Sequence, residues 1–308
     1  MKRARVLYLG LPLGALCLLH DGHELAAACI SRPDQPGLRR LKKKASFLGF
    51  PVLERPDLER ARVQSELRSL EADLIACWFW TKRVPLEVIE LVPFAFNVHP
   101  SLLPRHRGAD PYFWAIAAGD RVTGVTAHAL TERYDEGPIL AQRELAIPEG
   151  IDAWRLARKL DRPSLALMRE IVLRHAAGEP LEAVPQDDLR ATQAPEPSDE
   201  DCELRFDRPA RELERLVRAA APWPGAFTEH AGETIVVLEA RVVTGPEGLG
   251  RGQGARTPDG VVIATSDGAL LVTAARAEAQ DDVLRGPDVG RLFAALPRLG
   301  PAGSRSGR

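Results

Sequence analysis

Three polar side chains stand at alternate positions near the start of the segment Phe96 to Gly108: Asn97, His99 and Ser101. Alternate residues of an extended chain point to one side, so at the end of a strand these side chains enter one space. An amide offers a donor and an acceptor, and an imidazole gives or takes a proton near neutral pH. Such a set suits a reaction in which an amine attacks a carbonyl and an oxyanion forms. The same residues also fit a strand end with a hydrogen-bonded histidine and a turn.

A longer series of motifs in this region resembles the folate-dependent formyltransferase family. In chain order these motifs are Asn97-x-His99, Ser101 to Pro104, Arg107-Gly108, Thr123 to Thr126 and Asp135-x-Gly137. The resemblance covers nearly the whole chain and is closest to the methionyl-tRNA formyltransferases. It implies that a formyl group passes from 10-formyltetrahydrofolate, a co-substrate, to a primary amine. The implied chemistry needs no metal and no covalent intermediate.

The resemblance also assigns roles to individual residues. Asn97, His99 and Asp135 match the family's catalytic positions. The family's folate-contacting turn is matched by Ser101, Leu102, Leu103 and Pro104. We expect Asn97 and a protonated His99 to hold the oxyanion while Asp135 orients His99, because a neighbouring carboxylate raises the pKa of an imidazole.

Other polar residues near these motifs have less specific interpretations. We interpret His128, in the predicted strand Thr123 to Leu130, as a packing or surface residue. The aromatic run Cys77 to Thr81 lies at the end of the predicted strand Leu74 to Trp80, where it either walls a flat pterin or fills the core.

Two acceptors fit the resemblance. Initiator methionyl-tRNA is favoured by the carboxy-terminal segment and by the basic run Arg39 to Lys44, because Lys and Arg attract an RNA backbone. An amino-sugar nucleotide or other small amine is favoured by the shortness of that run and by the loop Trp78 to Arg83. A third hypothesis is a non-catalytic protein that binds folate or RNA. The presence of Asn97, His99 and Asp135 argues against it.

Length, net charge, cysteine spacing and apolar runs limit the class of protein and its compartment. The chain has 308 residues and a net charge of −2, which argues against a general nucleic-acid coat. Its four separated cysteines form no CxxC pair, so we expect reduced thiols in a cytoplasmic protein. The apolar run after Arg5 fits a first strand better than a signal peptide, and no run is long enough to span a membrane.

The apolar pattern predicts an α/β fold in two domains. Alternating strands and helices predict a Rossmann-like parallel-sheet formyltransferase domain over residues 1–185, with a helix Trp154 to Ala177 that breaks near Pro163. A polar, proline-containing linker is expected over residues 186–203. Short strands between glycine turns predict a small, OB-like β-barrel over residues 204–299. Residues 300–308 are expected to be a disordered tail.

Overall fold

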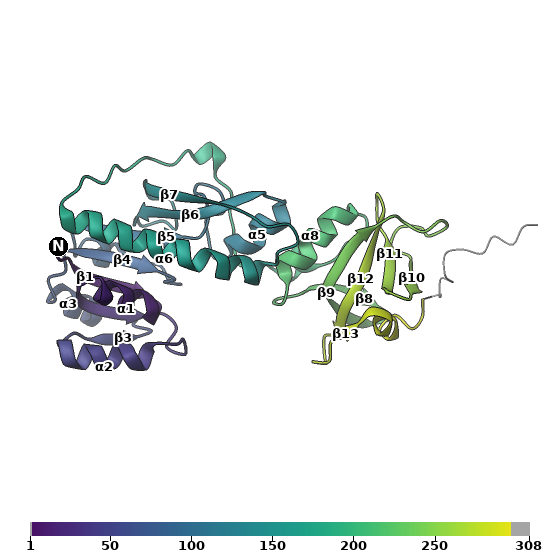
Figure 1. Ribbon diagram of the computed structural model, residues 1–308, viewed down its shortest axis with the longest axis horizontal. Coiled ribbons are helices and arrows are strands. Elements are labelled where there is room, and N and C mark those ends of the chain that lie inside the picture. Colours follow the sequence, from purple (N-terminus) through teal and green to yellow (C-terminus); the bar gives the residue numbers. More distant parts are fainter. Residues whose placement is uncertain (1, 297–308) are drawn as a thin grey trace, which may run out of the picture. The chain divides into compact units, whose positions relative to one another are not determined.

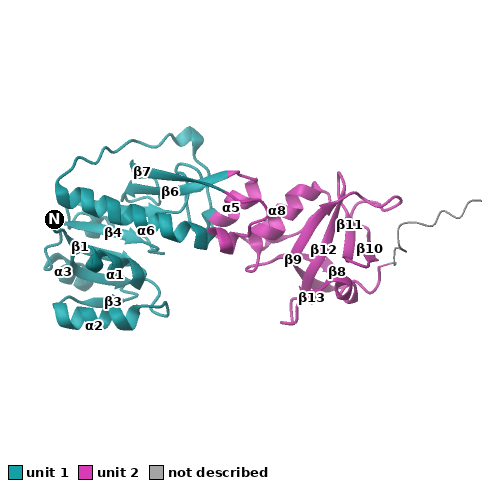
Figure 2. Ribbon diagram, in the orientation of Figure 1, with its two compact units in different colours: residues 1–111, 122–146, 157–195 teal, residues 112–121, 147–156, 196–308 magenta. Residues whose placement is uncertain are grey.

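The computed structural model describes residues 2–296, and the expected tail lies outside this range. Contacts divide the chain into two compact units (Figure 2). The first comprises residues 1–111, 122–146 and 157–195, and the second comprises residues 112–121, 147–156 and those from 196 onward. Because stretches of the two units alternate along the chain, no single cut in the sequence separates them.

The first unit contains a seven-stranded sheet in the order β3-β2-β1-β4-β5-β6-β7 (Figure 1). Its strands are β1 (Arg5–Gly10), β2 (Glu24–Ile30), β3 (Val52–Glu54), β4 (Leu74–Trp78), β5 (Phe94–His99), β6 (Val122–Ala129) and β7 (Ile139–Ala146). The first five strands in chain order pair in parallel, as the alternation of strands and helices predicts, whereas β6 and β7 are antiparallel. The carboxyl end of β5 therefore lies beside the antiparallel edge of the sheet.

Helices follow most of these strands. They are α1 (Pro12–His20), α2 (Leu38–Leu48), α3 (Ala61–Arg68), α4 (Leu86–Ile89), α5 (Pro111–Ala118) and α6 (Ala153–Ala177). Most of α5 and the first residues of α6 belong to the second unit. The predicted break near Pro163 is wrong, because α6 runs through this proline without interruption. A proline removes one helical hydrogen bond, and the buried apolar side chains on both sides of it keep the helix packed. These side chains include Leu160, Leu167, Met168 and Ile171.

The aromatic residue at the end of β4 belongs to the core. Trp78 is buried, and its indole N–H donates a hydrogen bond of 2.8 Å to the hydroxyl of Ser164 in α6. Of the two roles considered for the aromatic run, Trp78 therefore fills the interior and ties α6 to the sheet.

The second unit contains an antiparallel sheet in the order β10-β11-β12-β9-β8, with β13 paired to β12. Its strands are β8 (Ala226–His230), β9 (Glu233–Val243), β10 (Gly254–Thr257), β11 (Gly260–Ala264), β12 (Ala269–Ala277) and β13 (Leu284–Arg285). Before them come α7 (Asp199–Cys202) and α8 (Ala210–Ala220), and η2 (Gly286–Arg291) follows. The predicted α/β unit followed by a small antiparallel β unit is thus confirmed. Within residues 2–296, no helix is both long and apolar enough to cross a membrane.

Candidate active site

Strand β5 directs two of the candidate residues to one side of the sheet. Phe96 and Val98 are buried on one face of the strand. Asn97 and His99 alternate with them and point to the opposite face. The antiparallel register places Asn97 opposite His128 of β6. Because directly paired residues share a face, the side chains of Asn97, His99 and His128 meet there.

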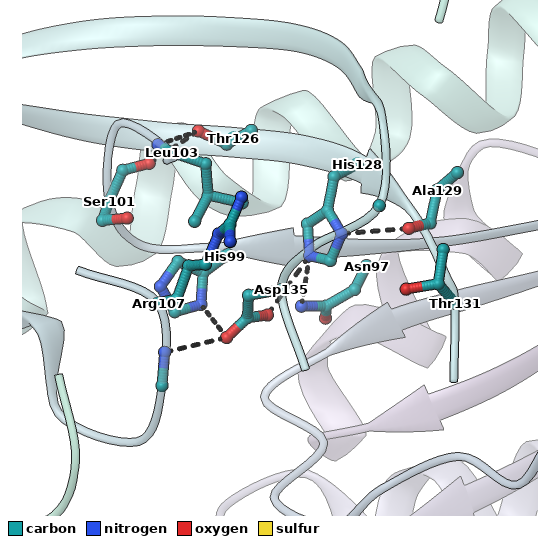
Figure 3. Close-up of polar contacts among 12 residues, drawn as sticks. Asn97, His99, Ser101, Leu103, Arg107, Thr126, His128, Ala129, Thr131 and Asp135 are labelled. Carbon is teal, nitrogen blue, oxygen red and sulfur yellow. Dashed lines mark hydrogen bonds and ion pairs between the residues drawn. The ribbon is translucent and has the colours of Figure 1, made fainter. Parts of the chain in front are cut away.

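Asp135 reaches these side chains from the loop after β6 (Figure 3). Its Oδ2 lies 3.3 Å from Nδ1 of His99 and accepts a 3.0 Å hydrogen bond from the backbone N–H of Gly108. Its Oδ1 lies 3.3 Å from Nε2 of His128. The carboxylate is therefore bracketed by two imidazoles, and each of its oxygens has an imidazole neighbour.

The loop that carries Asp135 is tightly folded. Asp135 has a positive φ of 56°, a conformation that aspartate tolerates better than most side chains. Two residues later, a Cβ on Gly137 would lie 1.8 Å from the carbonyl oxygen of Ala129. Only glycine permits this close approach, so the motif Asp135-x-Gly137 has a steric reason in the loop itself.

Asp135 is ionised in this setting. Burial, with 9% of the residue exposed, raises the pKa of its carboxyl group, but attraction to His99, contacts with His128 and the Gly108 N–H outweigh burial. The net effect lowers the pKa of Asp135 to about 2. A stable negative charge therefore stands beside His99 at neutral pH.

His99 differs from the expectation of a resting cation. Only 4% of the residue is exposed, and this burial lowers the pKa of His99 below its ordinary value, although Asp135 and the carbonyl of His106 act in the opposite direction. Nε2 lies 2.8 Å from that carbonyl oxygen, so both ring nitrogens face acceptors. A neutral ring satisfies one of them and a protonated ring satisfies both. The site thus suits a histidine that is neutral at rest and takes up a proton during reaction.

His128 is the residue that sequence reasoning missed. It is buried, its Nε2 lies 3.2 Å from Nδ2 of Asn97, and its Nδ1 lies 3.0 Å from the carbonyl oxygen of Ala129. Asn97 and Asp135 both contact this ring, so His128 connects the amide to the carboxylate. A signal was present, because Thr126 and His128 are polar residues at alternate positions of the strand and alternate residues share a face.

Replacing His128 with leucine is expected to lower kcat by about 5- to 150-fold, because loss of a buried hydrogen-bond partner costs about 1–3 kcal/mol. Loss of its hydrogen bond also raises the pKa of Asp135. Steady-state kinetics with both substrates saturating measures the effect. His20→Leu, at an exposed position, is the control, and a wild-type kcat in His128→Leu would contradict this role.

Hydrogen bonds of its buried residues stabilise the turn after β5. The Ser101 hydroxyl donates to the carbonyl of Arg105 at 2.6 Å, and the Leu103 N–H donates to the Thr126 hydroxyl at 3.1 Å. Ser101 and Leu103 are buried, whereas Leu102 and Pro104 are partly exposed. Ser101 and Leu103 thus stabilise the predicted folate-contacting turn from within. Leu102 and Pro104 offer apolar surface to a ligand.

An amide, an imidazole and a carboxylate meet beside the carboxyl end of β5, and such groups stabilise an oxyanion and move a proton in acyl-transferring enzymes. The formyl transferase family model matches residues 16–172, and the model of the formyl transferase C-terminal domain matches residues 197–284. The chain belongs to the formyltransferase family.

Curated relatives agree with this assignment. A methionyl-tRNA formyltransferase of Myxococcus xanthus strain DK1622 is 35% identical over 284 residues, which cover 88% of this chain and 90% of the relative. Another, from Anaeromyxobacter dehalogenans strain 2CP-1, is 36% identical over 291 residues, covering 89% of this chain and 92% of the relative.

Solved structures share the fold at lower identity. The N-formyltransferase of Helicobacter canadensis, in complex with folinic acid and dTDP-3-aminofucose, has a TM-score of 0.67 at 15% identity and covers 89% of this chain and 99% of its own. HypX of Aquifex aeolicus in complex with tetrahydrofolic acid has a TM-score of 0.61 at 19% identity, covering 98% of this chain and 50% of its own. At these identities the likeness is one of fold.

Proposed function

We propose that this protein transfers the formyl group of 10-formyltetrahydrofolate to a primary amine, with the amino group of initiator methionyl-tRNA as acceptor. The amine nitrogen forms a bond to the formyl carbon, and the bond from that carbon to N10 of the folate breaks. The amine loses one proton and N10 gains one, so no other reactant is needed. We assign this activity to the cytoplasm and the catalytic part to residues 1–185. The proposed linker covers residues 186–203, of which those up to 194 pack against the catalytic part, and the carboxy-terminal domain covers residues 204–299.

The observation that carries the proposal is the contact between Asp135 and His99 beside Asn97. Asp135 relays the proton that the attacking amine releases to Nδ1 of the neutral His99, 3.3 Å away, and then stabilises the imidazolium that forms. The Asn97 amide supplies a donor for the oxyanion on the formyl group. The partly exposed Leu102 and Pro104 supply apolar contact for the folate ring.

An RNA acceptor is supported by the outer face of α2. Leu41 and Ala45 are the buried residues of this helix, whereas Arg39, Lys43 and Phe47 recur every four residues on the opposite side. Phe47 is 88% exposed. Basic side chains that attract phosphates, next to an exposed aromatic ring, form a surface typical of RNA binding.

The deciding experiment supplies the purified protein with labelled 10-formyltetrahydrofolate and one acceptor at a time. We expect the label on methionyl-tRNA of the initiator type and none on amino-sugar nucleotides. Label only on an amino-sugar nucleotide would replace the acceptor and keep the reaction. Folate binding without transfer to any amine would overturn the proposed activity.

The double variant Arg39→Glu with Lys43→Glu tests the RNA surface. We expect KM for tRNA to rise and its dependence on salt concentration to weaken, because two phosphate contacts are lost. The matched control reverses two exposed charges on α3, Arg62→Glu with Arg68→Glu. Equal KM values in both double variants would exclude α2 from tRNA binding.

A further inference from the structure

A segment far along the chain holds the two loops that build the site. This strap, residues 184–194, begins with Val184, whose N–H and carbonyl exchange hydrogen bonds of 2.8 and 2.7 Å with Ile139. It ends with Ala194, whose N–H donates 2.7 Å to the carbonyl of Arg107. The strap thus crosses from the Asp135 loop to the loop after Pro104, and all of these residues belong to the first unit.

The strap is also tied along its length to the loop that contacts His99. The carbonyl of Thr192 accepts from the Arg107 N–H at 2.9 Å, and its hydroxyl accepts from the His106 N–H at 2.8 Å. A Cβ on Gly108 would lie 2.6 Å from the Ala194 carbonyl oxygen. The loop that presents the His106 carbonyl to His99 and the Gly108 N–H to Asp135 is therefore set by its fit against the strap.

One side chain of the strap contacts both loops at once. The Gln186 amide nitrogen donates to the carbonyls of Asp135 at 2.7 Å and Gly137 at 2.8 Å. Its amide oxygen accepts from Nε of Arg107 at 3.0 Å and from Nη2 at 2.8 Å. Both donor hydrogens and both acceptor positions of the amide are used, so its orientation is fixed by four contacts.

We infer that Gln186 is a positioning residue, an inference that rests on the proposed formyl transfer. It acts by fixing the distance between the Asp135 loop and the Arg107 loop. Asp135 sits at a positive φ and needs outside contacts to stay there. Gln186 supplies them at the carbonyls of Asp135 and Gly137. It thereby keeps the carboxylate within reach of His99 and the Gly108 N–H.

The second half of the arrangement anchors Gln186 itself. Arg107 is 4% exposed, and its Nη2 also donates to Oδ1 of Asp188 at 2.8 Å, while Nη1 lies 4.0 Å from Oε1 of Glu136. A buried guanidinium held by neighbouring carboxylates has little freedom to move. Gln186 can therefore transmit a fixed position from Arg107 to Asp135.

Two substitutions test whether the hydrogen bonds that Gln186 donates to the Asp135 loop are needed in addition to its contact with Arg107. Gln186→Glu keeps an oxygen acceptor for Arg107 but removes the donor to the two carbonyls, and Gln186→Ala removes both. We expect kcat to fall roughly 10- to 100-fold in both, with KM for folate and amine near the wild-type values, because small displacements of reacting groups cost about this much. Gln193→Ala is the control on the same strap, since no hydrogen bond of the Gln193 side chain is found among residues 2–296.

A second readout does not depend on turnover. An NMR titration of the Asp135 carboxyl carbon should show its pKa shifted upward in both Gln186 variants, because the groups that lower it, His99, His128 and the Gly108 N–H, lose their alignment. Gln186→Glu adds a carboxylate near Asp135 that raises this pKa by charge alone, so Gln186→Ala, which adds no charge, is the deciding variant. Wild-type kcat and an unshifted Asp135 pKa in Gln186→Ala would overturn the inference. If the wild type transfers no formyl group, the proposed function fails and the titration still decides the role of Gln186.

Discussion

Replacing Asp135 with asparagine is expected to lower kcat by about 10²- to 10⁴-fold, the range that general acid–base groups contribute. The amide has the same shape but no charge, so it does not stabilise the imidazolium that His99 forms. KM values should change little, because the carboxylate is bracketed by His99 and His128 and acts through them. Steady-state kinetics at saturating donor and acceptor measures the loss.

The adjacent carboxylate provides a matched control. Glu136 lies 3.6 Å from Arg133 and 4.0 Å from Arg107, and no contact between Glu136 and His99 is found within residues 2–296. Glu136→Gln should therefore change kcat far less than Asp135→Asn. Equal losses in the two variants would mean that general charge in the loop, and not the contact with His99, supports the reaction.

Asp135→Asn should also change how the free energy of unfolding depends on pH. The folded-state pKa of Asp135, about 2, is below its ordinary value of 3.8, so the ionised group stabilises the fold above pH 3.8. This contribution is lost as pH falls from that value towards 2. Urea unfolding at pH 5 and pH 3 should show a larger decrease in the wild type than in Asp135→Asn, and parallel decreases would contradict the lowered pKa.

Replacing His99 with alanine is expected to lower kcat by about 10²- to 10⁴-fold as well, because the variant lacks the group that takes the proton from the amine. In the wild type, kcat/KM should fall as pH decreases through the lowered pKa of His99, since this ratio reports groups of the free protein and the neutral ring is the active form. His99→Ala should lose this acidic limb. The measurement is kcat/KM as a function of pH, with one substrate saturating and the other varied.

Controls keep this result specific. His20→Ala changes an exposed histidine at the end of α1 and should retain the wild-type pH profile. Thermal unfolding of His99→Ala establishes that the fold persists. Near-normal turnover in a folded His99→Ala would refute the mechanism, because the mechanism assigns uptake of the amine's proton to His99 and to no other group.

Much of the site could be predicted because its local geometry follows from local sequence. The alternation of Asn97 and His99 between buried residues determines that both side chains share a face of β5, whatever packs beyond it. The apolar pattern likewise sets the order of strands and helices. These features depend on residues only a few positions apart, which is why the sequence by itself determined them.

What only the tertiary structure decided depends on residues far apart in the chain. The register of β5 against β6 places His128 beside Asn97, and burial by the surrounding chain leaves His99 neutral where its carboxylate neighbour alone predicted a cation. Packing on both sides of Pro163 keeps α6 whole. Gln186 contacts Asp135 across 51 positions of sequence. Pairing, burial and such long-range hydrogen bonds depend on the folded neighbourhood, and local residue spacing does not encode it.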